Sequence, residues 1–84
     1  MTIKEQESNI KKYVDEINEF IECDRHEMVY NGYTKDKTFM VHVMVTNGGV
    51  MFAEEKDYNL LINMLKFYKL GMESEREGYL IGSV

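Results

Sequence analysis

A cysteine and a histidine lie three positions apart in this chain, at Cys23 and His26, a spacing that occurs in metal sites. A structural zinc site needs four ligands, and the sequence offers only His42 as a further strong one. His42 falls between Met40 and Met44 in a strand-like run, where packing against neighbours is the ordinary role of a histidine. We therefore expect no metal site and no cofactor.

Cys23 is also a poor candidate for a catalytic nucleophile. A reactive thiolate needs a neighbouring base and electropositive surroundings, whereas Glu22, Asp24 and Glu27 flank this cysteine. The pair Gly48-Gly49 lacks the spacing of a phosphate-binding loop. Because no set of nucleophile, base and oxyanion donors can be assembled, we expect that the protein is not an enzyme.

Four acidic residues form a stripe on the outer side of the first predicted helix: Asp15, Glu16, Glu19 and Glu22. Paired carboxylates can serve as acid and base, but this stripe lies on a convex face without a pocket. A solvated face is the ordinary interpretation, and a docking surface for a basic partner is the functional one. The acids could also mimic DNA phosphates, although ten basic residues interleave with the fifteen acidic ones.

Methionine is unusually frequent, with six of the seven copies inside the chain. Three of them, Met40, Met44 and Met51, share one face of the predicted sheet. Flexible methionine side chains are common on adaptable binding surfaces, and they also fill irregular cores. Both interpretations stay open from the sequence alone.

A short chain must position these side chains. Its 84 residues predict one soluble domain, 1–84, with a core small enough that a partner chain would add stability. The net charge of −5 disfavours direct contact with nucleic acid, because the phosphate backbone is also negative. A single cysteine fits the reducing cytoplasm, and the apolar runs are too short to cross a membrane.

The first expected element is an amphipathic helix. Thr2 and Glu5 form the Thr-x-x-Glu pattern of a capping box, and the helix is expected to end near Cys23–Arg25. Its apolar residues recur at three- and four-residue spacing: Ile10, Tyr13, Val14, Ile17, Phe20 and Ile21.

Three strands are expected next, in an antiparallel meander: Glu27–Tyr33, Thr38–Thr46 and Val50–Glu54. Asn47-Gly48 is a strong hairpin signal, and a two-residue loop there would pair Val45 with Val50. Strict alternation then gives one core face: Met28, Tyr30, Phe39, Val41, Val43, Val45, Val50 and Phe52. The other face, still mostly apolar, would carry Val29, Asn31, Tyr33, Met40, His42, Met44, Met51 and Ala53.

A second helix is expected to open at Glu55–Asp57 and to end at Gly71, which completes an α+β domain of order α-β-β-β-α. Its apolar residues span an arc of roughly 220°, about twice what a surface helix needs. Residues 72–84 are expected to form an acidic, partly mobile tail, in which Tyr79–Ile81 could add a short edge strand.

This pattern leaves more apolar surface than two helices easily cover. The residues expected to meet a partner are Met40, Met44, Met51, Leu60, Met64 and Phe67. If both helices lie on the Phe39 face, the Met40 face needs a lid, and a twofold copy of the chain is the simplest source. We therefore expect a homodimer, with one helix on each face as the monomeric alternative.

Size, charge and the lack of catalytic motifs favour a small protein-binding module. By analogy of size and charge, we expect an anti-CRISPR-like inhibitor from a phage or mobile element, acting on a host enzyme or defence complex in the cytoplasm. The alternatives are a DNA mimic and a small-ligand or nucleotide-binding protein with a pocket at a dimer interface. Against the last, only Arg25 and Arg76 are available to grip a phosphate.

Overall fold

The computed structural model of the protein describes residues 1–21 and 26–81, with side chains described as far as Ser74. The elements, in chain order, are α1 (Ile3–Phe20), β1 (His26–Tyr33), β2 (Phe39–Val45), β3 (Gly48–Glu55) and α2 (Tyr58–Ile81). The three strands form an antiparallel meander in the order β1-β2-β3. The predicted α+β class and the α-β-β-β-α order are therefore confirmed.

Helix α1 begins at the predicted cap. The Thr2 hydroxyl accepts a hydrogen bond from the Glu5 backbone N–H at 3.1 Å, and this satisfies a donor that the first helical turn leaves without a partner. The helix ends at Phe20, earlier than expected, because Ile21 already has an extended backbone conformation. The position of Cys23, and with it the predicted end near Cys23–Arg25, lies outside the described residues.

The hairpin between β2 and β3 turns one residue earlier than predicted, which shifts the strand pairing by two residues. Thr46 and Asn47 make the turn, and Val45 lies opposite Gly48 rather than Val50. Gly48 has a φ of 143°, which glycine adopts without strain, so it can leave the turn and start the strand directly. Because the shift is an even number of residues, the side chains nearest the hairpin keep the faces that the sequence predicts.

Two irregularities in the strand pairing do move residues from one face to the other. Between β1 and β2 the register shifts at Asn31, so Tyr33 pairs with Phe39 and their rings lie 4.8 Å apart. Between β2 and β3 the register shifts after Met51, so Ala53 pairs with Val41 and is buried. The prediction that Tyr33 and Ala53 lie on the Met40 face was wrong, because an extra residue in a strand reverses the alternation beyond it.

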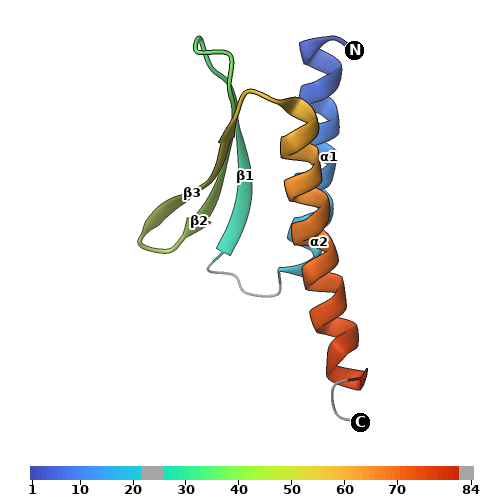
Figure 1. Ribbon diagram of the computed structural model, residues 1–84. Helices are drawn as coiled ribbons and strands as arrows, with labels where there is room; N and C mark the ends of the chain where they lie inside the picture. The colour runs from blue at the N-terminus through green and yellow to red at the C-terminus, as the bar shows by residue number, and fades with distance from the viewer. Residues whose placement is uncertain (22–25, 82–84) are drawn as a thin grey trace.

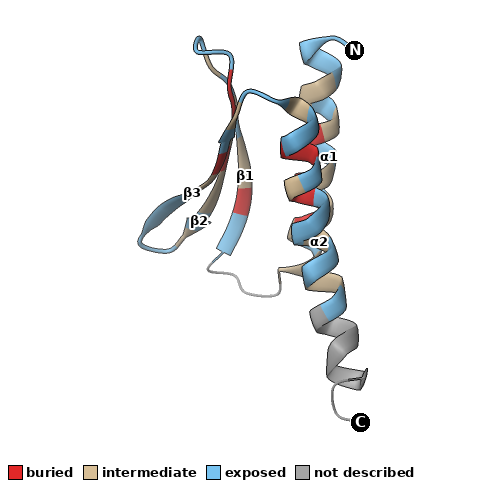
Figure 2. Ribbon diagram, viewed as in Figure 1, coloured by how far each residue is buried: buried red, intermediate tan, exposed pale blue. Residues whose placement is uncertain are grey.

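Both helices lie on the same side of the sheet, as Figure 1 shows. Helix α1 packs against β1 and α2, while α2 also reaches β3. The core forms where the helices face the strands (Figure 2) and consists of Ile10, Val14, Ile17, Met28, Phe39, Val41, Ala53, Leu61, Ile62 and Leu65. The molecule therefore has two layers, and the helices cover only one face of the sheet.

Helix α2 starts at a clear cap, since the Asp57 carboxylate accepts hydrogen bonds from the backbone N–H groups of Asn59 and Leu60. It continues to Ile81, so the predicted end at Gly71 and the predicted edge strand at Tyr79–Ile81 were wrong. Glycine inside a helix costs about 1 kcal/mol. Here Met72 packs against the core just beyond the glycine, and Lys69 pairs with Glu73 across it, so the helix keeps its contacts on both sides of Gly71.

Candidate functional site

The face of the sheet that turns away from the helices is the main candidate site, and we call it the open face. Its residues follow from the strand pairing and from the contact of Asn31 with His42: Glu27, Val29, Asn31, Gly32, Met40, His42, Met44, Gly49, Met51 and Glu54. Met44 and Met51 are 41% and 43% exposed, and Val29 and Met40 are half-buried. An antiparallel sheet with one solvated face normally carries polar side chains there, whereas this face combines polar residues with four apolar ones: Val29, Met40, Met44 and Met51.

Histidine occupies the middle of the open face. His42 lies on the central strand between Val29 and Met51, and its Nδ1 is 2.6 Å from the side-chain oxygen of Asn31. With Nδ1 donating to that oxygen, the imidazole is held in one orientation and its other nitrogen is left for a contact outside the sheet. The face therefore has a fixed polar group at the centre of an apolar patch.

Methionine lies flat on the sheet at one end of this face. If residue 49 carried a side chain, the Cβ atom of that residue would lie only 2.8 Å from the Met44 sulfur. Met44 therefore crosses directly over Gly49. Glycine is thus the residue that leaves room for Met44 to cover the backbone of β3. The side chain can rearrange easily because methionine has three rotatable bonds.

Charge on the open face is confined to two corners. Glu27 pairs across the strands with Met44 at one end, and Glu54 pairs with Met40 at the other end and on the opposite edge. The two carboxylates thus lie diagonally apart. Among the residues that the structure describes, this face carries no lysine or arginine. The remaining two corners are glycines, Gly32 and Gly49.

The residues predicted to form one interface are divided between different places. Met40, Met44 and Met51 belong to the open face, whereas Leu60 and Phe67 are 47% and 72% exposed on α2. Since α2 packs its other side on the core, these two side chains point away from the sheet. Met64 is half-buried and packs against the core.

The predicted acidic stripe is partly neutralised within the molecule. The Lys69 ammonium lies 2.9 Å from the Glu16 carboxylate, and this hydrogen bond raises the pKa of Lys69. Asp15 and Glu19 are exposed, while Glu22 lies outside the described residues. The stripe therefore contributes two exposed carboxylates in the part of the chain that the structure describes.

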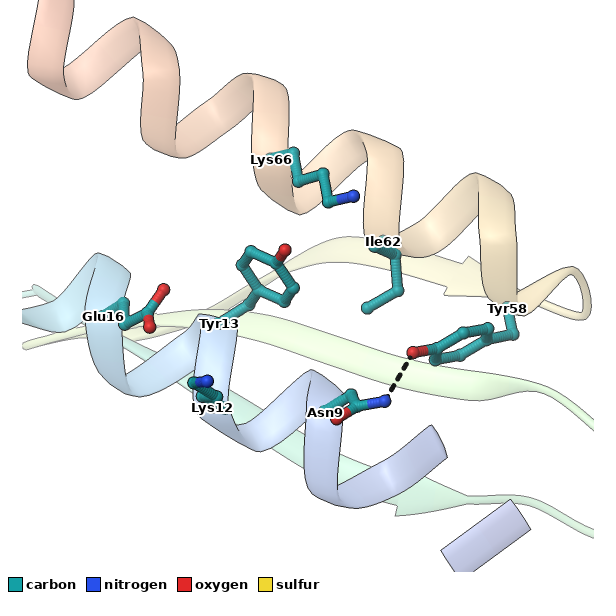
Figure 3. Close-up of a pocket in the computed structure, with 7 residues that line it drawn as sticks. All are labelled: Asn9, Lys12, Tyr13, Glu16, Tyr58, Ile62 and Lys66. Atoms are coloured by element: carbon teal, nitrogen blue, oxygen red, sulfur yellow. Dashed lines mark hydrogen bonds between the residues drawn. The ribbon is translucent and has the colours of Figure 1, made fainter. Parts of the chain in front are cut away.

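A groove between the two helices was not predicted. It has a volume of about 300 Å³ and is lined by Asn9, Lys12, Tyr13, Glu16, Tyr58, Ile62 and Lys66. Figure 3 shows the two tyrosine rings along the groove, with Asn9 donating to the Tyr58 hydroxyl at 3.0 Å. Lys66 lies 6.0 Å from the centre of the Tyr13 ring. The sequence does not show that Tyr13 and Tyr58 line one groove, because it does not show how two helices pack together.

Metal ligands, membrane-spanning helices and similarity to known proteins were each sought. No three histidine, cysteine, aspartate or glutamate side chains there gather closely enough to hold a metal ion. Neither helix, over the same residues, combines the length and apolar character needed to span a bilayer. Comparisons of the chain with protein-family models, curated proteins and solved structures found no match. Any function must therefore be argued from the surfaces themselves.

Proposed function

We propose that this protein is a small binding module that contacts another protein through the open face of its sheet. One observation carries the proposal: both helices pack on the Phe39 face and leave Met40, Met44 and Met51 without a covering layer. Contiguous apolar patches of this kind mark interaction sites. Methionine suits such a contact because its side chain adapts its shape to a partner.

Two matched variants test which surface is used. Met51→Glu places a carboxylate on the open face, and Leu60→Glu does so on α2 at a nearly equal exposure of 47%. Each tagged chain is used to capture proteins, which are then identified by mass spectrometry. The proposal predicts that the wild-type chain and Leu60→Glu retain the same partner and that Met51→Glu loses it. Loss with Leu60→Glu alone would contradict the proposal.

A narrower form of the proposal is an inhibitor, encoded by a phage or mobile element, that blocks a basic surface of a host enzyme or defence complex. It is supported by the net charge of −5 and by the exposed carboxylates of Asp15 and Glu19. Replacing both residues with lysine would weaken capture of a basic target by more than tenfold, because complementary charge would become repulsion. Unchanged capture would remove α1 from the contact.

A second candidate function is binding of a small anion that carries an aromatic ring, such as a nucleotide, in the groove between the helices. The supporting observation is the combination of two tyrosine rings with Lys12 and Lys66 on its rim (Figure 3). Calorimetry with a panel of nucleotides tests it. Binding that is lost in Lys66→Gln and kept in Met51→Glu would favour this function, and no heat with any nucleotide would exclude it for the panel.

A further inference from the structure

The protein exposes more surface than a folded chain of its mass normally does. Its accessible area is 6101 Å². A folded monomer of 9.9 kDa exposes about 5,200 Å². The excess is roughly 900 Å². Part of it belongs to α2, which extends beyond the end of the sheet (Figure 1), and part to the open face, because no third layer covers that face and the molecule is only 15 Å thick between Cα atoms.

The charges of the open face are arranged so that the face can meet itself. Its two acids, Glu27 and Glu54, lie at diagonal corners, and Gly32 and Gly49 form the other two. A twofold axis in the plane of the interface, parallel or perpendicular to the strands, exchanges each corner with a neighbouring corner. Each glutamate of one copy then meets Gly32 or the Met44 side chain that lies over Gly49 in the other copy, so no two carboxylates come together.

Pairing through the edges of the sheet is less favourable than pairing through the open face. The edge strands β1 and β3 both carry an irregularity, at Asn31 and at Phe52, which bends the strand and interrupts its line of hydrogen-bonding groups. The open face, in contrast, is continuous across all three strands. Two such faces can pack about 10 Å apart with their strands nearly aligned.

We infer that a second copy of this chain covers the open face, sheet on sheet, about a twofold axis that passes close to His42. This inference rests on the proposed function, since it names the partner of the same surface. His42 lies near the axis because it is in the middle of the central strand. It therefore comes close to its own counterpart, while Met44 and Met51 are buried around it.

Sedimentation velocity over a dilution series tests the inference on the full chain. The wild-type mass is expected to rise with concentration from 9.9 kDa towards twice that value. Met51→Glu is expected to raise the dissociation constant roughly 10- to 100-fold, since a carboxylate would be buried without a partner. Met51→Leu, which keeps the apolar contact, and Leu60→Glu, on the other side of the molecule, are expected to dimerise like the wild type. Circular dichroism checks that each variant is folded.

His42→Leu gives a second readout that a simple folding defect would not produce. Removing two polar rings near the axis is expected to tighten the dimer several-fold, because neither ring must then lose its contact with water. A wild-type chain that stays at 9.9 kDa throughout the series, or a dimer that Met51→Glu leaves intact, would overturn the inference. In either case the proposed function still stands if Met51→Glu abolishes capture of a different protein.

Discussion

The two faces of the sheet are built from the same three strands, and they differ in what covers them. On the helix-covered face, Met28, Phe39 and Val41 are almost completely buried, and α1 and α2 supply the apolar side chains that surround them. On the open face, Met44 and Met51 keep over two fifths of their surface exposed, although they are no more polar. Burial on one face stabilises the monomer, while the apolar surface left on the other is available to a partner.

The sharpest way to separate the faces is to truncate two adjacent residues of β2. Phe39→Ala removes a ring from the core and is expected to lower the free energy of unfolding by about 3–5 kcal/mol. Met40→Ala, one position along the strand on the open face, is expected to cost less than about 1 kcal/mol in the monomer. Urea unfolding at low protein concentration measures both. Similar losses would mean that the open face is packed as tightly as the covered one.

Two asparagines extend the comparison to hydrogen bonds. Asn18 of α1 bonds both the N–H and the C=O of Met28, at 2.8 and 2.9 Å, and so fastens β1 to the helix layer. Asn18→Ala is expected to cost about 1–3 kcal/mol, because both backbone groups lose a partner in a half-buried place. Asn31→Ala on the open face should cost less than about 1 kcal/mol, since water can replace its bond to His42. Thermal unfolding measures the stability that each variant loses. A larger loss for Asn31→Ala than for Asn18→Ala would contradict this comparison of the two faces.

Tyr30 makes a smaller contribution to the stability of the fold. It packs against the core and donates a hydrogen bond to the Glu7 carboxylate at 2.7 Å. Burial, followed by that hydrogen bond and the charge of Glu7, raises the pKa of Tyr30. In the unfolded chain the phenol ionises near pH 10, so its contribution to stability is complete below that pH and is lost as the pH rises further.

Replacing Tyr30 with phenylalanine tests this contribution. The variant is expected to lose about 1 kcal/mol at neutral pH, the usual worth of one such hydrogen bond. It should also lose less stability than the wild type between pH 9 and pH 11. Urea unfolding across that range measures the difference, and parallel pH profiles for the two proteins would show that Tyr30 is not the titrating group.

Much of the fold could be predicted because it rests on periodic patterns. The apolar spacing around Ile10 and Ile17, and the alternation through Phe39 and Val41, placed α1 and the covered face correctly. The faces of Tyr33 and Ala53 could not be predicted, because an irregularity in a strand leaves no mark in the alternation of side chains. Alternation also predicted which methionines share a face, and the excess of apolar surface favoured the observed arrangement, in which both helices leave this face uncovered, over one helix on each face.

The features that the sequence did not predict depend on contacts between distant parts of the chain. The length of α2 was underestimated because Gly71 resembles a helix end, while the contacts of Met72 and the pairing of Lys69 with Glu73 are visible only in the structure. The pairing of Glu16 with Lys69, which divides the acidic stripe, joins residues from two helices. The groove between those helices was missed for the same reason.

If a second copy of the chain covers the open face, as inferred above, the methionines on that face report it directly. Oxidation by hydrogen peroxide, followed by mass spectrometry, gives a separate rate for each methionine over a range of protein concentrations. Met44 and Met51 are expected to be oxidised several-fold more slowly at high concentration, as dimers form, whereas Met1 is expected to keep its rate. Rates for Met44 and Met51 that do not change with concentration, or that change no more than the rate of Met1, would contradict the inference.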